Sequence, residues 1–143
     1  MNVREILSVK GREVVTIDPN ANLATAAKVL AERRIGALVV TGPEDRIVGI
    51  LSERDIVTAL AKCGIDALET KITKVMTRKI TTCSLSDTIS SIMESMTAGK
   101  FRHVPVVEQG RLAGIISIGD VVKHRLMEME NEQAALRDYI QTA

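Results

Sequence analysis

The sequence predicts an α+β (α/β-like) fold made of two βαββα repeats. Two observations support this. The phrase GILSERDIV at residues 49–57 returns as GIISIGDVV at residues 114–122, with Gly, Ser and Asp in matching places. The longer segments that contain these phrases, residues 22–57 and 87–122, also align with each other. Because one copy of about 50–60 residues buries little apolar surface alone, we expect the two sheets to pack together about a pseudo-twofold axis.

Each repeat is expected to open with a strand and to continue with an amphipathic helix. The opening strands are VVTID at residues 14–18 and KITTC at residues 79–83. In the helices that follow, apolar residues recur at positions i, i+3, i+4 and i+7, which indicates one buried stripe. The two stripes are Leu23, Ala26, Ala27 and Leu30, and Ile89, Ile92, Met93 and Met96.

A hairpin and a second helix complete each repeat. Short apolar segments on either side of a turn rich in Gly, Pro or Asp predict two strands. The strands are Ala37–Val40 and Ile47–Leu51 in the first copy, and Val104–Val107 and Leu112–Ile116 in the second. The second helices are expected to begin near Ser52 and Ser117.

We therefore divide the chain into a first repeat at residues 1–68, a second repeat at 69–127 and a C-terminal helical extension at 128–143. Residues 63–77 bridge the copies, and Met76 is expected to fill the base of the second copy. A stripe along the long final helix steps alternately by four and three, with one polar interruption: Val122, Leu126, Met129, Gln133, Leu136 and Ile140. This stripe favours coiled-coil packing between subunits or packing back onto the same module.

Composition narrows the classes of function. A formal net charge of +1, with one Phe, one Tyr and no Trp, disfavours nucleic-acid binding. No apolar run approaches the roughly 20 residues needed to insert across a membrane, and residues 1–8 show no secretory signal, so we expect a cytoplasmic protein. In that reducing compartment Cys63 and Cys83 are expected to be free thiols, with Cys83 buried in a strand.

The sequence contains no pattern typical of an enzyme. It has no nucleophile–base–orienter set, no phosphate-binding glycine loop and no metal-ligand spacing. His124, which lies between Lys123 and Arg125, is expected on a solvated helix face. We therefore expect neither catalysis nor a metal site.

The repeated phrase has two interpretations. Ser52 with Asp55, and Ser117 with Asp120, fit Ser-x-x-Asp, a capping box that needs no ligand. The first turn of a helix also offers free N–H groups and a partial positive charge that suit a phosphate. A carboxylate there can accept bonds from two ribose hydroxyls. Capping does not explain the glycine three residues before each serine, which indicates that something approaches the strand backbone closely.

These motifs resemble a tandem pair of cystathionine-β-synthase (CBS) domains, a Bateman module. The resemblance covers residues 3–127 and rests on TIDP, IGALVV and GILSERDI in the first copy and on VMT, FRHVPVV and GIISIGDVV in the second. It implies regulatory binding of adenosine-containing ligands in clefts between the repeats. These ligands are AMP, ADP, ATP, S-adenosylmethionine or a dinucleotide such as NAD(H), with AMP favoured.

The resemblance assigns roles to residues of both copies. The phosphate is assigned to Ser52 and Ser117, and the ribose hydroxyls to Asp55 and Asp120. The adenine pocket is assigned to Thr16, Ile17 and Pro19 in the first copy and to Thr82 and Ser84 in the second. The strand after the first helix supplies Ile35, Gly36 and Ala37, or Arg102, His103 and Val104. Basic residues expected near phosphates are Arg34, Arg54, Lys100, Arg102 and His103, although His103 fits a structural hydrogen bond equally well.

Three functions follow from these observations. The favoured one is a stand-alone regulatory module that binds an adenine nucleotide and signals to an unidentified protein, assembled as a homodimer as Bateman modules commonly are. The alternative is an oligomeric scaffold with ligand-free pockets, and a third is a redox or stress-response accessory that binds NAD(H). Because the two copies differ around the assigned residues, two unequal sites and one empty site are both open.

Overall fold

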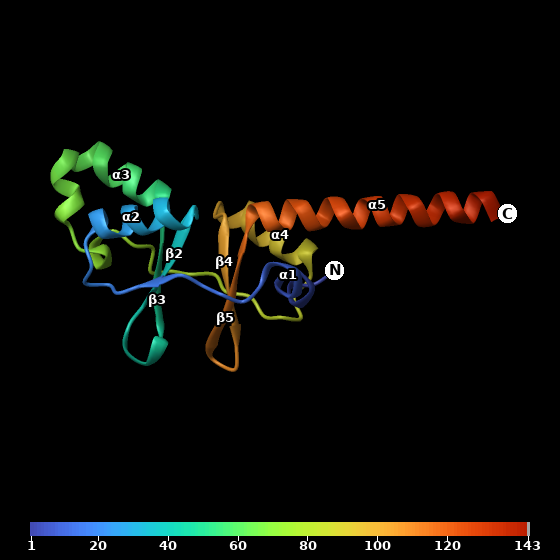
Figure 1. Ribbon diagram of the computed structural model, residues 1–143, viewed down its shortest axis with the longest axis horizontal. Coiled ribbons are helices and arrows are strands. Elements are labelled where there is room, and N and C mark those ends of the chain that lie inside the picture. Colours follow the sequence, from blue (N-terminus) through green and yellow to red (C-terminus); the bar gives the residue numbers. More distant parts are fainter. Residues whose placement is uncertain (143) are drawn as a thin grey trace. The chain divides into compact units, whose positions relative to one another are not determined.

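The computed structural model describes residues 1–142, and residue 143 of the predicted C-terminal extension lies outside the described residues (Figure 1). The chain forms two compact units. The first-repeat unit contains Glu13–Thr81 and Gln109–Ala113, and the second-repeat unit contains Met1–Arg12, Thr82–Glu108 and the chain from Gly114 onward. The predicted two-repeat α+β fold with a long C-terminal helix is confirmed.

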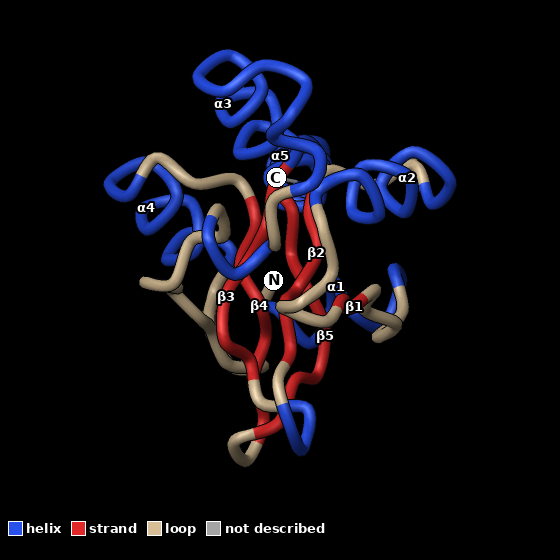
Figure 2. The backbone as a smooth tube through the Cα atoms, turned by 90° about the vertical axis from the view of Figure 1, so that its left-hand side faces the viewer, coloured by secondary structure: helices blue, strands red, loops and turns tan. Residues whose placement is uncertain are grey.

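The first-repeat unit is built on a three-stranded sheet in the order β1-β2-β3. Strand β1 pairs in parallel with β2, which pairs antiparallel with β3 across a bulge at Val40/Thr41. Helices α2 and α3 lie at the end of the β2–β3 hairpin opposite its turn (Figures 1 and 2). The elements are β1 Thr16–Ile17, α2 Leu23–Arg33, β2 Ala37–Thr41, η1 Pro43–Asp45, β3 Ile47–Ser52, α3 Glu53–Cys63, η2 Gly64–Glu69 and η3 Ile72–Lys74.

The second-repeat unit repeats the helix–hairpin–helix order around a two-stranded sheet, β4-β5. Helix α4 precedes the hairpin, and α5 follows it and extends to the end of the described chain (Figure 1). A further helix, α1, belongs to this unit although it opens the sequence. The elements are α1 Val3–Lys10, α4 Ile89–Gly99, β4 His103–Glu108, β5 Arg111–Ser117 and α5 Ile118–Thr142.

The predicted opening strands are much shorter in the structure. Only Thr16–Ile17 of the segment 14–18 forms a strand. The predicted strand 79–83 is wrong except at Cys83, which makes a single parallel bridge to Val106. Cys83 donates its N–H to the Pro105 carbonyl and accepts from Val107 N, at 3.0 and 2.9 Å. After the paired residues each segment turns toward the next helix: the Ala21 N–H donates to the Asp18 carbonyl at 3.1 Å, and the Asp87 N–H donates to the Ser84 carbonyl at 3.2 Å.

Two segments that open the sequence repeats occupy equivalent places in the two units. Val3 donates its backbone N–H to the Asp87 carbonyl at 2.9 Å, and Ile72 donates to the Ala21 carbonyl at 2.8 Å. Asn2 and Lys71, the preceding residues, each form a bridge with the residue before a helix, Thr88 and Asn22. Helix α1 and the short turn η3 are therefore counterparts.

These counterparts explain the glycines of the repeated phrase. A Cβ on Gly49 would lie 2.6 Å from Met76 Sδ, and a Cβ on Gly114 would lie 2.8 Å from Leu7 Cδ1. Something does approach each strand backbone closely, as predicted, but it is an apolar side chain and not a ligand. The prediction that Met76 fills the base of the second copy is wrong, because Met76 packs over Gly49 in the first-repeat unit.

The predicted helix stripes contribute to the core of both units, with one correction. Leu23, Ala26 and Leu30 are buried in the first-repeat unit, as are their counterparts Ile89, Ile92 and Met96 in the second. Met93, predicted to be core, is 36% exposed because its position lies at the edge of the buried face.

His124 was predicted on a solvated face, and this is wrong: it is 4% exposed. It lies one turn after the buried Val121, on the part of α5 that packs against α4. Its Nδ1 has no hydrogen-bond partner among the described residues. The charged neighbours Lys123 and Arg125 thus misled the prediction, because helix position and not sequence neighbourhood decides burial.

The two cysteines follow the prediction of free thiols. Cys63 is exposed at the end of α3, and Cys83 is buried at its bridge to β4. Burial raises the pKa of the Cys83 thiol to about 12, because the surroundings disfavour the thiolate. Cys83 is therefore a structural residue and a poor nucleophile.

Candidate functional site

Both copies of Ser-x-x-Asp form a complete capping box. Ser52 donates its backbone N–H and its hydroxyl to Asp55 Oδ2 at 2.9 and 3.1 Å, and accepts from Asp55 N at 3.3 Å. The corresponding distances between Ser117 and Asp120 are 2.9, 3.0 and 3.2 Å. The capping interpretation is therefore confirmed in both units. The box uses Oδ2 of each half-buried carboxylate and leaves Oδ1 outside it.

The residue directly before each hairpin accepts a backbone hydrogen bond from the first turn of the capped helix. Glu53 donates its backbone N–H to the Gly36 carbonyl at 2.9 Å, and Ile118 donates to the Arg102 carbonyl at 2.8 Å. This matched bond makes Gly36 the counterpart of Arg102, and Ala37 the counterpart of His103. The predicted backbone residues therefore do lie beside the start of α3 or α5.

A basic residue ends the helix that precedes each strand. Arg34 and Lys100 are the C-caps of α2 and α4, and both adopt the left-handed conformation, with φ of 54° and 56°. Non-glycine residues pay roughly 1 kcal/mol or more for this region. Each cation lies two residues before the carbonyl that accepts from the capped helix, that of Gly36 or of Arg102. Each unit therefore has a positive charge near the start of α3 or of α5.

The other predicted cations are less closely placed. Arg54 is exposed in the first turn of α3, and Arg102 is exposed just before β4. His103 is half-buried at the first position of β4 and has a polar or electrostatic partner. Val104, its neighbour, is fully buried in the core.

A groove of about 550 Å³ lies in the first-repeat unit between α2 and α3. It brings together the predicted residues Arg34, Ile35 and Gly36. Ser52 and Asp55 do not line it. Its lining also includes Ala27, Leu30, Ala31, Glu53, Ile56 and Val57. Glu53 was not among the predicted residues, although its position directly after the capping serine could have indicated it.

The predicted adenine-pocket residues lie on the short opening segments. Thr16 is exposed and Ile17 is half-buried, and the Pro19 carbonyl accepts a bond from Thr73 N at 3.0 Å. In the second-repeat unit Thr82 and Ser84 are exposed. The Ser84 backbone N–H donates to Asp87 Oδ2 at 2.8 Å. All predicted residues of one copy thus lie in one unit.

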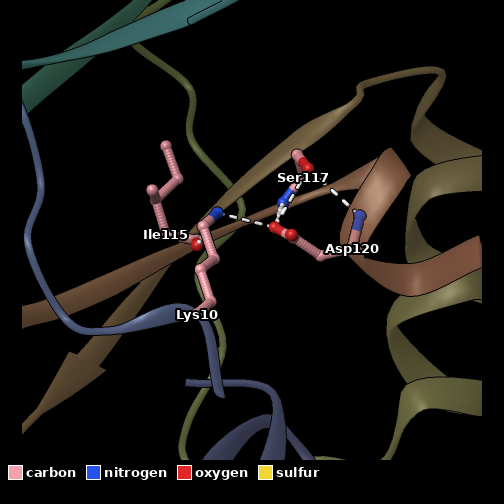
Figure 3. A network of polar contacts seen from close by, with 4 residues as sticks. All are labelled: Lys10, Ile115, Ser117 and Asp120. Carbon is pink, nitrogen blue, oxygen red and sulfur yellow. Dashed lines mark hydrogen bonds and ion pairs between the residues drawn. The ribbon is translucent and has the colours of Figure 1, made fainter. Parts of the chain in front are cut away.

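One residue that sequence reasoning missed distinguishes the two boxes. Lys10, at the end of α1, lies with its Nζ 2.6 Å from Asp120 Oδ2 and 2.8 Å from the Ile115 carbonyl oxygen (Figure 3). Burial disfavours the charged form of Asp120, but hydrogen bonds from Lys10 and Ser117, with the Lys10 charge, outweigh it. The pKa of Asp120 is therefore lowered.

Within residues 1–142 no three His, Cys, Asp or Glu side chains gather closely enough to hold a metal ion. None of the helices in this part of the chain combines the length and apolar character that crossing a membrane requires.

The profile of the CBS domain family matches this sequence twice, at residues 3–62 and 72–126. The chain belongs to the CBS domain family. A crystal structure of a CBS-domain containing protein from Agrobacterium tumefaciens is 48% identical, with a TM-score of 0.85, over 87% of this chain and 92% of that one. Both matches begin where the equivalent opening segments begin, so the family repeat includes α1 and η3.

Other CBS proteins extend this comparison. A 17.7 kDa protein of Acidianus ambivalens is 32% identical over 83% of this chain and 71% of its own length. A CBS domain pair crystallised in complex with 5′-methylthioadenosine and S-adenosyl-L-methionine is 27% identical, with a TM-score of 0.78, over 91% of this chain and 98% of that one. Some relatives are much longer: this chain spans 22% of a CBS domain-containing protein of Arabidopsis thaliana that is 34% identical.

Proposed function

We propose that this CBS domain pair is a non-catalytic regulatory module that binds adenosine-containing ligands at the start of α3 and of α5. The observation that carries the proposal is the construction that both units share. Each has a Ser–Asp box, a carbonyl directly before a strand that accepts from the first helical turn, and a basic C-cap in the left-handed conformation. A related CBS domain pair was crystallised with two adenosine-containing compounds, and this supports the ligand class.

The chemistry of the box suits a ribose phosphate. If the Ser52 hydroxyl turns from Asp55 to a phosphate, Asp55 Oδ2 regains an acceptor site. Its two oxygens can then accept hydrogen bonds from the two vicinal hydroxyls of a ribose. Such bonds to a charged carboxylate are stronger than bonds to a neutral acceptor. In the first turn of α3, Glu53 N–H donates to the Gly36 carbonyl and Asp55 N–H to the Ser52 hydroxyl, which leaves the Arg54 N–H and the helix dipole to favour the phosphate charge. Arg34, at the end of α2, lines the same groove as Glu53 of the first turn of α3.

Among the adenosine ligands we propose AMP, with NAD(H) as the alternative. One ribose, one phosphate and one adenine match one box, one basic C-cap and one opening segment, Thr16–Pro19. A dinucleotide would need a second ribose site of the same kind. The ligand would act by stabilising one of two arrangements of the protein, which a separate regulated protein would recognise.

The proposal predicts that Asp55→Asn binds AMP about tenfold or more weakly than the wild-type chain at one site. The reason is that a charge-assisted acceptor is lost. Isothermal titration of the full chain with AMP measures this, with ADP, ATP, NADH and S-adenosylmethionine as parallel probes.

The matched control is Asn22→Ala, which removes the N-cap of α2 in the same unit. Loss of this cap should lower stability by about 1 kcal/mol and leave AMP affinity unchanged. If Asp55→Asn and Asn22→Ala alter stability alike and both leave ligand binding intact, the phrase only caps helices.

We also propose that the chain forms a homodimer through α5. The predicted stripe is exposed on a single chain, with Leu136 60% and Ile140 64% exposed. Val122, Leu126 and Met129 on the same stripe are also exposed. A second copy offers an identical stripe and would bury both. This exposed helix equally favours the scaffold function, which predicts a well-folded dimer whose melting temperature no adenosine ligand raises.

A further inference from the structure

The ribose-binding acid assigned to the second repeat already has a cationic partner. Lys10 Nζ and the Ser117 backbone and hydroxyl all donate to the same oxygen, Asp120 Oδ2 (Figure 3). The lysine also donates to the Ile115 carbonyl, so two acceptors from β5 and α5 fix its position. The ion pair is mostly sheltered, with the side chains of Lys10 and Asp120 32% and 22% exposed.

The first-repeat unit lacks this contact although its sequence offers a lysine at the same place. The apolar residues Val3 and Leu7 correspond to Ile72 and Met76, and the same offset pairs Lys10 with Lys79. Lys79 is exposed and makes no hydrogen bond or ion pair within residues 1–142, and the bonds of Asp55 in that range come from Ser52.

Local structure explains why only one of the two lysines reaches the acid. Helix α1 continues to Lys10 and carries its side chain to the start of α5. The counterpart η3 ends at Lys74, and Thr77 then exchanges two backbone bonds with Ile50, at 2.9 and 3.0 Å. The chain at Lys79 is therefore not helical, unlike α1 at Lys10, and the Lys79 side chain makes no hydrogen bond or ion pair with Asp55.

We propose that Lys10 is an internal gate on the second site, which a ribose must displace from Asp120 before that site can fill. This inference rests on the proposed function. When the Ser117 hydroxyl turns to a phosphate, Lys10 still occupies Asp120 Oδ2 and offsets the charge of the carboxylate, so only Oδ1 is left to accept a ribose hydroxyl without competition. Asp55 has no such competitor. The site at Asp55 therefore fills first, and filling the site at Asp120 releases the end of α1.

The test uses Asp55→Asn chains, in which the first site is weakened about tenfold or more and the second is unaltered. These chains are titrated with AMP and with 5′-methylthioadenosine, which carries no phosphate. Lys10→Met in this background should tighten binding of both probes about fivefold, as expected for loss of a partly exposed competing ion pair. Lys79→Met, the matched control from the other repeat, should change nothing. Lys10→Arg keeps the charge and should bind as Lys10 does.

Unchanged or weaker binding of 5′-methylthioadenosine in Lys10→Met would overturn the gate, as would two equal AMP sites in the wild-type chain. Weaker AMP binding alone would make Lys10 a phosphate contact and also contradict it. If no probe binds the wild-type chain or any variant, the proposed function fails and the gate fails with it. Carboxyl NMR of the ligand-free chain checks the variant independently, because Lys10→Met should raise the pKa of Asp120 while the Asp55 signal stays in place.

Discussion

Asp55 and Asp120 share one bonding pattern and differ in one neighbour. In both, a serine three residues earlier holds Oδ2 and the helix start. Only Asp120 has a lysine within 2.6 Å. This one difference distinguishes the two copies of the motif, because a hydrogen bond from a charged partner is stronger than one from a neutral partner.

Asp120 should make the stability of the second-repeat unit depend on pH. Its pKa is lowered in the folded chain: burial opposes this, and the bonds from Lys10 and Ser117 outweigh burial. A lowered folded pKa means that the stabilisation is present above the ordinary aspartate value and is lost as pH falls below about 4. Lys10→Met should therefore cost about 1 kcal/mol in urea unfolding at pH 7 and less at pH 3, where protonation of Asp120 begins to remove the ion pair. An equal cost at both pH values would contradict the ion pair.

The repeated glycines give a second prediction at this scale. Gly49→Ala should destabilise the protein by about 1–3 kcal/mol, because its Cβ would press on Met76 Sδ. Met76→Ala alone should cost about 2–5 kcal/mol by opening a cavity. In the double variant the new methyl enters that cavity. The loss in free energy of unfolding, measured in urea, should therefore be smaller than the sum of the two single losses. Strict additivity would show that the two residues do not share this space.

Sequence reasoning predicted that something lies against these glycines but not what it is. A strand glycine indicates close approach, and the residue types alone do not distinguish a ligand from a methionine or a leucine. The box was predictable in full, because Ser-x-x-Asp determines its own local bonds. His124 was misplaced because its burial depends on where α4 packs, which the charges at Lys123 and Arg125 do not report.

At the scale of elements, the helices and hairpins follow from the sequence and the opening segments do not. Periodic apolar residues marked α2 and α4, and turn residues marked both hairpins. Helix α1 was not predicted, because residues 3–10 correspond to residues 72–79 at an offset of 69 residues, whereas residues 22–57 align with 87–122 at an offset of 65. The correspondence of Lys10 with Lys79 therefore does not follow from the main repeat. The predicted strand 79–83 was wrong except at Cys83, which makes a single bridge to Val106.

The exposed apolar stripe of helix α5 is the contact through which the proposed homodimer forms. Leu136→Glu and Ile140→Glu together should dissociate the proposed homodimer, because they place charges in an apolar stripe. Sedimentation should then report a monomer with unchanged helix content. The control is Arg137→Glu, on the neighbouring residue outside the stripe. If both variants sediment as the wild-type chain does, the dimer interface lies elsewhere or the chain is monomeric.

At the scale of the whole molecule, duplication gives two units with the same site architecture and unequal chemistry. The matched carbonyl bonds of Gly36 and Arg102 and the matched C-caps Arg34 and Lys100 show that the architecture is common to both. The lysine contact at Asp120 separates them. A module with one open and one gated site would respond to ligand over a wider concentration range than two equal sites would.

The most direct test is a crystal structure of the full chain grown with AMP. The account predicts ribose hydroxyls within about 2.6–3.0 Å of both Asp55 carboxylate oxygens, with the Ser52 hydroxyl turned to the phosphate. Saturating AMP with the Ser52–Asp55 box intact, and the nucleotide absent or bound elsewhere, would contradict it.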